Sequence, residues 1–365
     1  MKVLHIFKTC YPETKGGIEL AIRFLCSGCR EKGIESTILT LGSSNNEYTF
    51  EGTKIVVVKQ QIKFSSTNFS FLLFKKFIQL QKENDIIHFQ YPWPTGDLLS
   101  FFTSKKLIVS YQSDIVKQST LKYFYAPLEH LFLSKMDAIV ASSPQYALSS
   151  KNLRKFKNKV SVIPLALDEK YYPCASTPLI NKWENKVGSD FFLFIGVLRY
   201  YKGLNYLLEA AKINNLPVVI AGDGPEREKL ALYIKEHQLT NVKMVGFITE
   251  EDKDALHKLS KAFVFPSHLR SEAFGLSLLE ALSHGSPIIS FDIGTGSSYV
   301  NEHNKTGFCL PKVSAKSFSN AMIKLNNSEN IEAFSTNARA HFERAFTISH
   351  YINNYYNLYQ KLLNE

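Results

Sequence analysis

Short apolar runs alternate with longer amphipathic stretches along the whole chain. In the first half these runs predict buried strands at residues 3–7, 36–41, 54–58, 86–89, 107–111, 138–141 and 160–163. A second series predicts strands at residues 191–196, 217–221, 242–246, 262–266 and 287–291. The segments between the runs have room for helices, for example over residues 18–32. The pattern therefore predicts an α/β fold with parallel sheets covered by helices.

The series of strands is interrupted once, over residues 168–190, which are polar and contain two prolines. A chain of 365 residues is also long for a single core. We therefore expect a first domain at 1–167, a linker at 168–190 and a second domain at 191–345. Two doubly wound domains in tandem predict a ligand cleft between the carboxyl ends of their strands.

Composition is that of a globular protein, with 45% hydrophobic and 21% charged residues. No apolar run approaches the length of a membrane span, and the first residues lack the pattern of a signal peptide. The cysteines Cys10, Cys26, Cys29, Cys174 and Cys309 are scattered and odd in number, which favours reduced thiols. Cys26 and Cys29 lack the second pair of a zinc site, and we expect them to pack in a helix. We expect a cytoplasmic protein.

The net positive charge of the chain comes from its first half. Residues 1–167 hold 22 Lys and Arg against 12 Asp and Glu, while residues 168–365 balance at 21 each. Such a half is typical of a protein with an anionic partner. Residues 59–82 contain five lysines and no acid, and a helical face there is predicted from Phe69, Leu72, Leu73, Phe77 and Leu80. This face fits either an interfacial helix on anionic lipid or an ordinary helix packed on the sheet. Its apolar content favours lipid over nucleic acid.

Two carboxylates eight residues apart, Glu272 and Glu280, flank Gly275 at the predicted start of an apolar helix. A helix start offers free N–H groups and the positive end of a dipole, which suit a phosphate. Carboxylates on each side suit hydroxyl groups. The arrangement fits a nucleotide-sugar, although two glutamates at this spacing also occur on solvated helix faces.

Cations and glycines follow several other predicted strands of the second half. Gly196 ends a strand, and Arg199 and Lys202 come directly after it, where two cations can clamp a diphosphate or form surface ion pairs. Gly222 lies in the turn AGDGPE, which we interpret as mainly structural. Phe247 and Ile248 follow Gly246, where backbone groups can face a nucleobase.

In the first half, Gly16 and Gly17 lie between the first strand and a helix, where backbone can approach a phosphate or sugar. They do not form G-x-G-x-x-G, which counts against an ordinary NAD enzyme. Gln112 and Asp114 follow the strand at 107–111 and offer polar groups to a sugar. Asp114 also fits a helix cap.

Together the segments HIFKTCYPETKGGIE, GVLRYYKGL, AGDGPE, VGFI and FPSHLRSEAFGLSLLEAL resemble the retaining glycosyltransferase family 4, which has the two-Rossmann GT-B fold. The resemblance spans nearly the whole chain. It implies that the last helix, 346–365, returns to the N-terminal domain, which is the acceptor side. It also implies that the second domain binds the nucleotide-sugar.

The resemblance implies a role for each matching residue. Arg199 and Lys202 would bind the donor diphosphate, Glu280 the ribose, and Glu272 the transferred sugar. The amides of Phe274, Gly275 and Leu276 would lie near sugar and phosphate, Gly17 near the phosphate, and Phe247 and Ile248 near the base. Family members often carry a histidine where this chain has Gln112. Glutamine can hydrogen-bond but cannot transfer a proton at neutral pH, so an acid or base role is excluded there.

The predicted function is a retaining hexosyltransferase, class 2.4.1, of surface-polysaccharide biosynthesis. The predicted donor is GDP-mannose and the predicted acceptor a hydroxyl of a lipid-linked glycan. We expect no cofactor, no metal requirement and no nucleic-acid partner, and a peripheral position on the inner face of the cytoplasmic membrane. The alternatives are a UDP-hexose donor, a nucleotide-sugar epimerase or phosphorylase of the same fold, and a non-catalytic module that binds an anionic polymer.

Overall fold

The computed structural model describes residues 1–14, 16–64, 67–115 and 119–365, with main chain alone at 62–64, 67–69 and 119–124. The described chain forms two compact units. Unit 1 comprises Met1–Ala166 and Ile348–Glu365, and unit 2 comprises Leu167–Thr347. The boundary therefore places residues 168–190 in unit 2, where part of that segment forms a helix.

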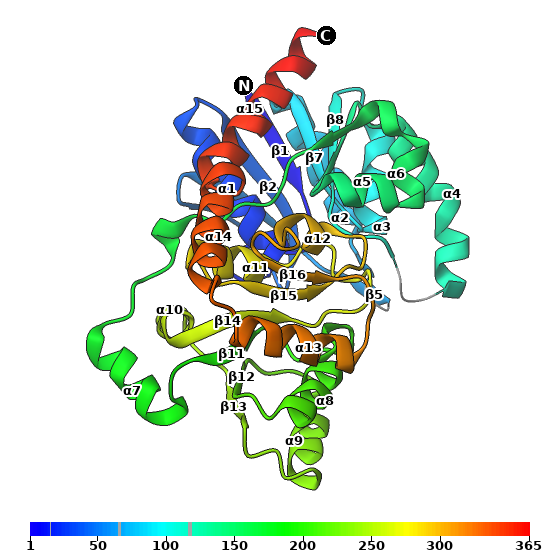
Figure 1. The fold of residues 1–365 in the computed structure, drawn as a ribbon. Coiled ribbons are helices and arrows are strands. Elements are labelled where there is room, and N and C mark those ends of the chain that lie inside the picture. The colour runs from blue at the N-terminus through cyan, green and yellow to red at the C-terminus, as the bar shows by residue number, and fades with distance from the viewer. Residues whose placement is uncertain (15, 65–66, 116–118) are drawn as a thin grey trace. The chain divides into compact units, whose positions relative to one another are not determined.

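Unit 1 is built on an eight-stranded sheet with the order β10-β9-β8-β7-β1-β2-β4-β3 (Figure 1). Its strands are β1 (Lys2–Ile6), β2 (Glu35–Gly42), β3 (Asn46–Phe50), β4 (Thr53–Lys59), β7 (Ile86–Tyr91), β8 (Lys106–Tyr111), β9 (Ala138–Ala141) and β10 (Val160–Val162). All neighbours pair in parallel except the edge strand β3, which runs antiparallel to β4. A separate antiparallel pair is formed by β5 (Ile62–Phe64) and β6 (Thr67–Phe69).

The helices of unit 1 cover its sheet. They are α1 (Gly17–Glu31), α2 (Phe71–Leu80), α3 (Pro94–Leu99), α4 (Ser119–Lys135), α5 (Pro144–Ser149), α6 (Lys151–Lys155) and α15 (Ile348–Asn364), with the 3-10 turns η1 (Gln81–Glu83), η2 (Ser100–Phe102) and η3 (Lys157–Lys159). The last helix, α15, packs beside α1 in Figure 1 and contributes buried tyrosines to the core.

Unit 2 contains a six-stranded, fully parallel sheet with the order β13-β12-β11-β14-β15-β16. The strands are β11 (Phe191–Ile195), β12 (Val218–Ala221), β13 (Val242–Gly246), β14 (Ser260–Phe265), β15 (Ile288–Phe291) and β16 (Gly307–Leu310). Its helices are α7 (Thr177–Val187), α8 (Leu204–Asn214), α9 (Arg227–Glu236), α10 (Glu250–Leu259), α11 (Leu276–Ser283), α12 (Gly296–Val300), α13 (Ala315–Asn326) and α14 (Ile331–Ala345), with the turns η4 (Glu169–Tyr171) and η5 (Tyr200–Lys202).

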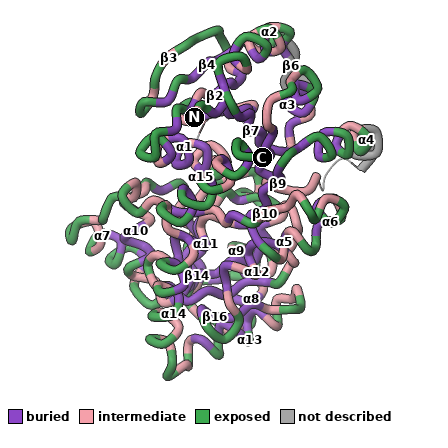
Figure 2. Tube along the Cα trace, turned by 90° about the horizontal axis from the view of Figure 1, so that it is seen from above, coloured by how far each residue is buried: buried purple, intermediate pink, exposed green. Residues whose placement is uncertain are grey.

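Buried apolar strands form the centre of each unit, as the purple traces of β7 and β14 show in Figure 2. The predicted α/β class with parallel sheets is confirmed, and the predicted strands appear to within a residue or two. The sequence did not predict β3, β5, β6 and β16. These strands are short or lie at sheet edges, where the apolar signal is weak.

The apolar face predicted over residues 59–82 is largely internal. Helix α2 starts only at Phe71, because residues 62–64 and 67–69 form strands, and the side chain of Phe69 lies outside the described residues. Leu73, Phe77 and Leu80 are buried, at 0%, 0% and 5% exposure. Of the two alternatives for this face, the ordinary helix packed on the sheet therefore applies to these three residues.

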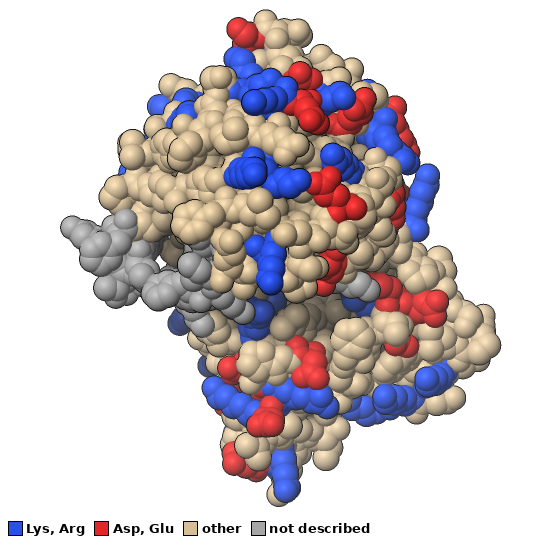
Figure 3. All heavy atoms as spheres, turned by 180° about the vertical axis from the view of Figure 1, so that it is seen from behind, with Lys and Arg blue, Asp and Glu red and all other residues tan. Residues whose placement is uncertain are grey.

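Charge on the surface is mixed. On the face seen in Figure 3, Lys and Arg lie among broad uncharged areas and also beside Asp and Glu. All five cysteines are free thiols, and burial raises the pKa of Cys10 and of Cys29 to about 12. Within the described part of the chain, no helix is both long and apolar enough to cross a membrane.

Candidate active site

The carboxyl ends of the unit 2 strands bring several predicted site glycines together. Gly196 and Gly222 directly follow the neighbouring strands β11 and β12, and Gly246 ends β13. The amide of Gly222 donates to the carbonyl of Gly246 over 2.7 Å. Gly222 has φ 126°, and a Cβ there would lie 2.0 Å from the Gly196 carbonyl oxygen. Only glycine permits this approach, so the edge presents bare backbone.

Lys202 and Glu272 form a buried ion pair at the same edge. Lys202 Nζ lies 2.5 Å from Glu272 Oε2, and the two residues are 9% and 8% exposed. Ser267 Oγ donates to the same carboxylate oxygen over 3.2 Å, and Lys202 Nζ lies 5.0 Å from the centre of the Phe265 ring. Arg199, three residues before Lys202, is exposed and forms no ion pair with any described residue. The site thus holds one neutralised cation and one available cation.

Helix α11 begins directly after this pair. Its N-cap, Gly275, has φ 91°, and a Cβ there would lie 2.6 Å from the Phe265 ring. The predicted site residue Phe274 is buried. The amide of Leu278 donates to the Gly275 carbonyl over 3.0 Å, whereas the amides of Leu276 and Ser277 lie too early in the helix for an intrahelical acceptor. A phosphate group fits such a helix start.

Glu280 lies one turn from the end of α11 and is 7% exposed. Its Oε1 accepts from Lys253 Nζ over 3.3 Å, whereas its buried Oε2 has no hydrogen-bond partner among the described residues. Burial alone lowers the pKa of Lys253, but the carboxylates of Glu280 and Glu250 raise it overall. A buried carboxylate oxygen without a donor is uncommon, which makes this oxygen a candidate acceptor for a ligand hydroxyl.

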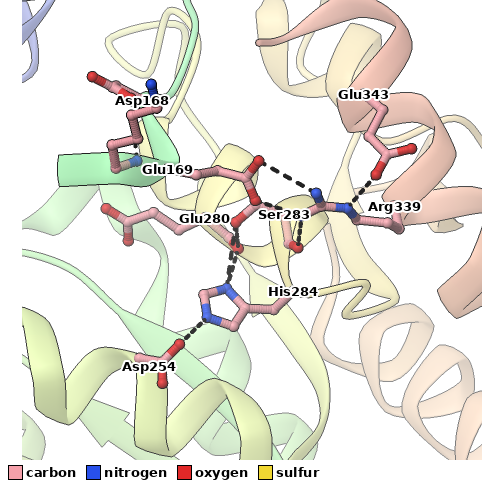
Figure 4. Close-up of polar contacts among 9 residues, drawn as sticks. Asp168, Glu169, Asp254, Glu280, Ser283, His284, Arg339 and Glu343 are labelled. Carbon is pink, nitrogen blue, oxygen red and sulfur yellow. Dashed lines mark hydrogen bonds and ion pairs between the residues drawn. The ribbon is translucent and has the colours of Figure 1, made fainter. Parts of the chain in front are cut away.

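The main chain of Glu280 is also held in place (Figure 4). Its carbonyl oxygen accepts from Ser283 Oγ and from His284 Nδ1, each over 2.8 Å, and His284 Nε2 lies 2.9 Å from Asp254 Oδ1. Figure 4 also shows Arg339, whose Nη1 donates to the Ser283 carbonyl over 2.6 Å and lies 2.5 Å from Glu169. These contacts fix the carboxyl end of α11 and with it the position of Glu280.

The residues predicted to face a nucleobase differ in exposure. After Gly246, the Phe247 side chain is 82% exposed, whereas the Ile248 side chain is 7% exposed. Only the backbone of Ile248 is therefore available to a ligand in this arrangement.

In unit 1, the glycines predicted near a phosphate begin α1. Gly16 is its N-cap and Gly17 its first residue. A Cβ at Gly16 would lie 2.4 Å from Glu19 Oε2, and Thr9 and Thr14 donate to Glu19 Oε1 over 2.8 and 3.1 Å. Glu19, which the sequence did not single out, therefore organises this loop.

Gln112 and Asp114 are both anchored by side chains of unit 1. Gln112 Nε2 donates to Gln90 Oε1 over 2.8 Å. Asp114 Oδ1 accepts from Tyr111 over 2.9 Å and from Ser150 over 2.8 Å. The predicted site residues are therefore divided between the two units.

A cavity of about 390 Å³ opens at the carboxyl ends of β1, β2 and β4 in unit 1. Its lining includes Lys8, Thr9 and Gln60, together with Thr40, whose buried hydroxyl has no partner among the described residues. The size and the polar groups suit a small polar ligand.

Two family models match the chain. Residues 15–171 match the model described as Glycosyltransferase Family 4, and residues 176–341 match the model described as glycosyl transferases group 1. The O-antigen chain mannosyltransferase C of Escherichia coli is 41% identical over all of this chain and 99% of its own length. The chain belongs to glycosyltransferase family 4. The predicted family and the predicted glycosyltransferase activity are confirmed.

Other similar proteins agree with this assignment. The D-rhamnosyltransferase WbpZ of Pseudomonas aeruginosa is 43% identical to this chain, and the match covers 95% of this chain and 92% of WbpZ. Among solved structures, sucrose-phosphate synthase from Thermosynechococcus elongatus matches with a TM-score of 0.82 at 18% identity, over 100% and 99% of the two chains. The catalytic domain of starch synthase IV from Arabidopsis thaliana matches with a TM-score of 0.75 at 13% identity, over 100% and 99%. The predicted GT-B fold is confirmed.

The sequence did not predict several residues that lie around the unit 2 site of the glycosyltransferase. Lys253 reads as an ordinary lysine on an amphipathic helix, and His284 follows α11 without any motif. Tyr172 lies in the segment predicted as a linker, yet burial and the Glu280 carboxylate raise its pKa. The only sequence signal was indirect, since the polar stretch 168–190 carries aromatic residues that a free linker does not need.

Proposed function

We propose that the glycosyltransferase transfers a hexose from a nucleotide-sugar, with GDP-mannose as the leading donor, to a hydroxyl of a lipid-linked glycan. The observation that carries the donor site is the buried Oε2 of Glu280, which lacks a donor and lies on the helix that starts at Gly275. A ribose hydroxyl supplies that donor. The amides at the start of α11 then receive the diphosphate.

The Lys202–Glu272 pair supports an exchange of partners when the donor binds. In the unliganded protein the two charges neutralise each other across 2.5 Å. A donor diphosphate competes for Lys202, and Arg199 adds a second cation. Glu272 is then free to accept hydrogen bonds from hydroxyls of the transferred sugar. This exchange avoids leaving either buried charge unpaired, which would cost several kcal/mol, on the order of 3–5.

Retention of configuration is explained by attack on the face from which the diphosphate leaves. The bond between sugar C1 and the phosphate oxygen breaks, and a bond from C1 to the acceptor oxygen forms on the same face. The acceptor proton passes to the departing phosphate oxygen, whose charge Arg199 and Lys202 stabilise. The protein contributes positioning and electrostatic stabilisation. Among the described residues no three His, Cys, Asp or Glu side chains are grouped as a metal site requires.

Similarity to an O-antigen mannosyltransferase and to a D-rhamnosyltransferase supports a role in O-antigen synthesis and leaves two donor sugars to compare. Rhamnose is mannose without the hydroxyl at C6, so both sugars present the same groups at C2, C3 and C4. The two donors to compare are therefore a GDP-hexose and its 6-deoxy form, and the UDP-hexose from the sequence analysis is a third candidate.

Thermal unfolding with GDP, UDP, ADP or CMP tests the donor site. We expect a stabilising shift with GDP, because a ligand that binds only the folded protein raises its unfolding temperature. The Glu280→Gln variant should reduce that shift, whereas Glu251→Gln, at an exposed position of α10, should retain it. A shift with UDP alone moves the donor to a UDP-hexose. The absence of any shift rejects the proposed donor site.

We propose that the acceptor lies in an anionic membrane and that the protein binds this membrane. The binding surface differs from the apolar face of α2 that the sequence predicted. Phe71 and Ile78 of α2 and Phe101 and Phe102 of η2 are exposed by 70%, 38%, 40% and 54%. The two elements are adjacent, since Gln81 Nε2 donates to the Phe102 carbonyl over 3.0 Å. Exposed lysines on and after α2, Lys75 and Lys82, supply positive charge for acidic headgroups.

Sedimentation with vesicles that contain phosphatidylglycerol tests this surface. Phe101→Ser with Phe102→Ser, and separately Lys75→Gln with Lys82→Gln, should each reduce the bound fraction. Leu148→Ser, at a 73% exposed position of α5, is the control. Unchanged binding by both double variants rejects the membrane surface and leaves the donor site unaffected.

A further inference from the structure

A chain of hydrogen bonds runs through the interior of unit 1 from Gln112. The Gln112 Nε2 donates to Gln90 Oε1 over 2.8 Å, and Gln90 Nε2 lies 3.5 Å from His88 Nε2. On the other side of the imidazole, His88 Nδ1 lies 2.8 Å from the hydroxyl of Tyr359 on α15. The chain thus connects the carboxyl end of β8 to the last helix.

A branch leaves the same imidazole nitrogen. Ser110 Oγ lies 2.8 Å from His88 Nε2 and 2.7 Å from the hydroxyl of Tyr355. Gln90 and Ser110 are opposite each other in the parallel register of β7 and β8, and residues two apart in a strand share a face. Because side chains alternate along a strand, His88, Gln90 and Ser110 all lie on the face of the sheet that α15 covers.

Every inner member of this chain is buried. Gln90, His88, Ser110, Tyr355 and Tyr359 are all exposed by 3% or less. Buried polar groups are costly unless each is paired, and a network that is fully paired fixes one arrangement of its members. The tyrosines of α15 therefore do more than fill the core.

His88 is held neutral, because burial lowers its pKa well below the ordinary value and the neighbouring His5 adds to that effect. The His5 ring centre lies 5.1 Å from that of His88. A neutral imidazole has one donor and one acceptor nitrogen. Its tautomer is consequently tied to the direction of the hydrogen bonds on both sides.

The donor and the acceptor of each hydrogen bond follow from the orientation of the Gln90 side chain. Its Oε1 accepts from Gln112, so its Nε2–H group faces His88 Nε2 at 3.5 Å, and this contact is attractive only when that nitrogen carries no proton. His88 Nδ1 carries the proton and donates it to Tyr359. Ser110 donates to His88 Nε2, and Tyr355 donates to Ser110. This sequence of bonds leaves Gln112 Oε1 as an acceptor at the strand end.

We propose that Gln90 is a positioning residue, which holds Gln112 so that its amide oxygen accepts a hydrogen bond from a hydroxyl of a sugar bound at the carboxyl end of β8. The orientation of that amide is coupled to the His88 tautomer, because Gln90 contacts both Gln112 and His88. The inference rests on the proposed function in one respect, namely that the protein binds a sugar. It gives a physical reason for glutamine at a position where the family often has histidine.

Turnover of Gln90→Met tests the positioning role. Methionine has a similar length but neither donates nor accepts strongly. We expect kcat to fall roughly 10- to 100-fold, with the donor KM nearly unchanged, because the donor site lies in unit 2 and only the orientation of Gln112 is lost. Tyr359→Phe should lower kcat in the same manner. Tyr356→Phe is the matched control, because Tyr356 lies on the same helix outside the chain of bonds.

A second readout needs no turnover. In protein labelled with ¹⁵N-histidine, the tautomer of His88 is read from its ring nitrogen shifts, and the signal is assigned by its loss in His88→Leu. We expect the Nδ1–H tautomer in the unmodified protein and its loss or a mixture in Gln90→Met. An Nε2–H tautomer in the unmodified protein overturns the inferred direction.

The variants also separate this inference from the proposed function. If Gln112→Met abolishes transfer while Gln90→Met leaves kcat unchanged, the positioning inference fails and the sugar contact stands. If Gln112→Met transfers normally although His88 has the expected tautomer, the contact with the sugar fails and with it the role of Gln90. Loss of nucleotide binding in the unmodified protein would instead reject the donor site.

Discussion

The two units treat buried carboxylates in different ways. In unit 2, Glu272 and Glu280 are paired with Lys202 and Lys253. In unit 1, Asp97 accepts from the Tyr125 hydroxyl, and no Lys or Arg of the described residues pairs with it. The two kinds of partner suit different ligands. A lysine paired with a carboxylate can bind an incoming anion instead, whereas hydroxyl and carboxyl groups exchange hydrogen bonds with the hydroxyls of a ligand.

The backbone shows the same contrast. Among the described glycines, those with positive φ lie in unit 2 except for Gly33 and Gly52. Unit 2 therefore exposes main-chain groups at its strand ends, where a phosphate can approach closely. Unit 1 presents side chains such as Gln112 and Asp114 instead. A diphosphate of fixed shape and charge suits the first kind of edge, and an acceptor read through its hydroxyls suits the second.

Among the proposed variants, Glu272→Ala should have the largest effect on the unit 2 site. The change removes the proposed sugar contact and leaves Lys202 without its carboxylate, so we expect kcat to fall on the order of 10³-fold. The measurement is single-turnover transfer from the donor. Glu251→Ala, at an exposed position, should leave the rate unchanged. Near-normal turnover of Glu272→Ala would remove Glu272 from the site.

Lys202→Ala should have the next largest effect. Loss of a cation that stabilises the leaving diphosphate lowers kcat/KM by an amount equivalent to about 3 kcal/mol. Lys229→Ala, whose side chain is 80% exposed on α9, is the matched control. An unchanged kcat/KM for Lys202→Ala would mean that the 2.5 Å pair with Glu272 is structural only.

Gly275→Ala tests the backbone side of the comparison. An added Cβ meets both the strain of φ 91° and the Phe265 ring at 2.6 Å, so we expect a loss of about 3 kcal/mol in the free energy of unfolding. Gly188→Ala isolates the strain alone, because Gly188 has φ 84° and nothing within 4 Å of the added atom. It should cost about 1 kcal/mol. Equal losses in urea unfolding would show that the ring contact has no cost.

Asp97→Asn should have the smallest effect and concerns unit 1. Burial raises the pKa of Asp97 well above 3.8, so the folded protein holds this proton more tightly than the unfolded chain. The unfolding free energy therefore declines as the pH rises above about 4, toward the raised pKa. Asparagine removes this dependence and should change stability by about 1 kcal/mol or less at neutral pH.

Urea unfolding at pH 5 and pH 8 measures the difference. The two stabilities should lie closer together in Asp97→Asn than in the unmodified protein. Asp137→Asn, at an exposed position, should keep the original difference. An identical pH dependence in all three proteins would contradict a retained proton on Asp97.

The local pattern of apolar and polar residues was enough to predict most strands of this glycosyltransferase. Apolar runs located the strands, because a strand buried on both faces leaves a continuous signal in the sequence. The glycines and charged groups that follow these runs were located equally well, since parallel strands carry their carboxyl ends to one edge. Glu272, Glu280, Arg199 and Lys202 could thus be chosen without a structure.

Tertiary structure alone decided which of these groups meet and what supports them. The pairing of Lys202 with Glu272 and of Lys253 with Glu280 joins residues 70 and 27 positions apart. The contact of His88 with Tyr359 joins residues 271 apart. The inward face of α2 was likewise settled by packing, because an amphipathic helix has the same pattern whether it covers a sheet or a membrane. Periodicity records which faces of an element are apolar, but the partner of each face is fixed only when distant segments fold together.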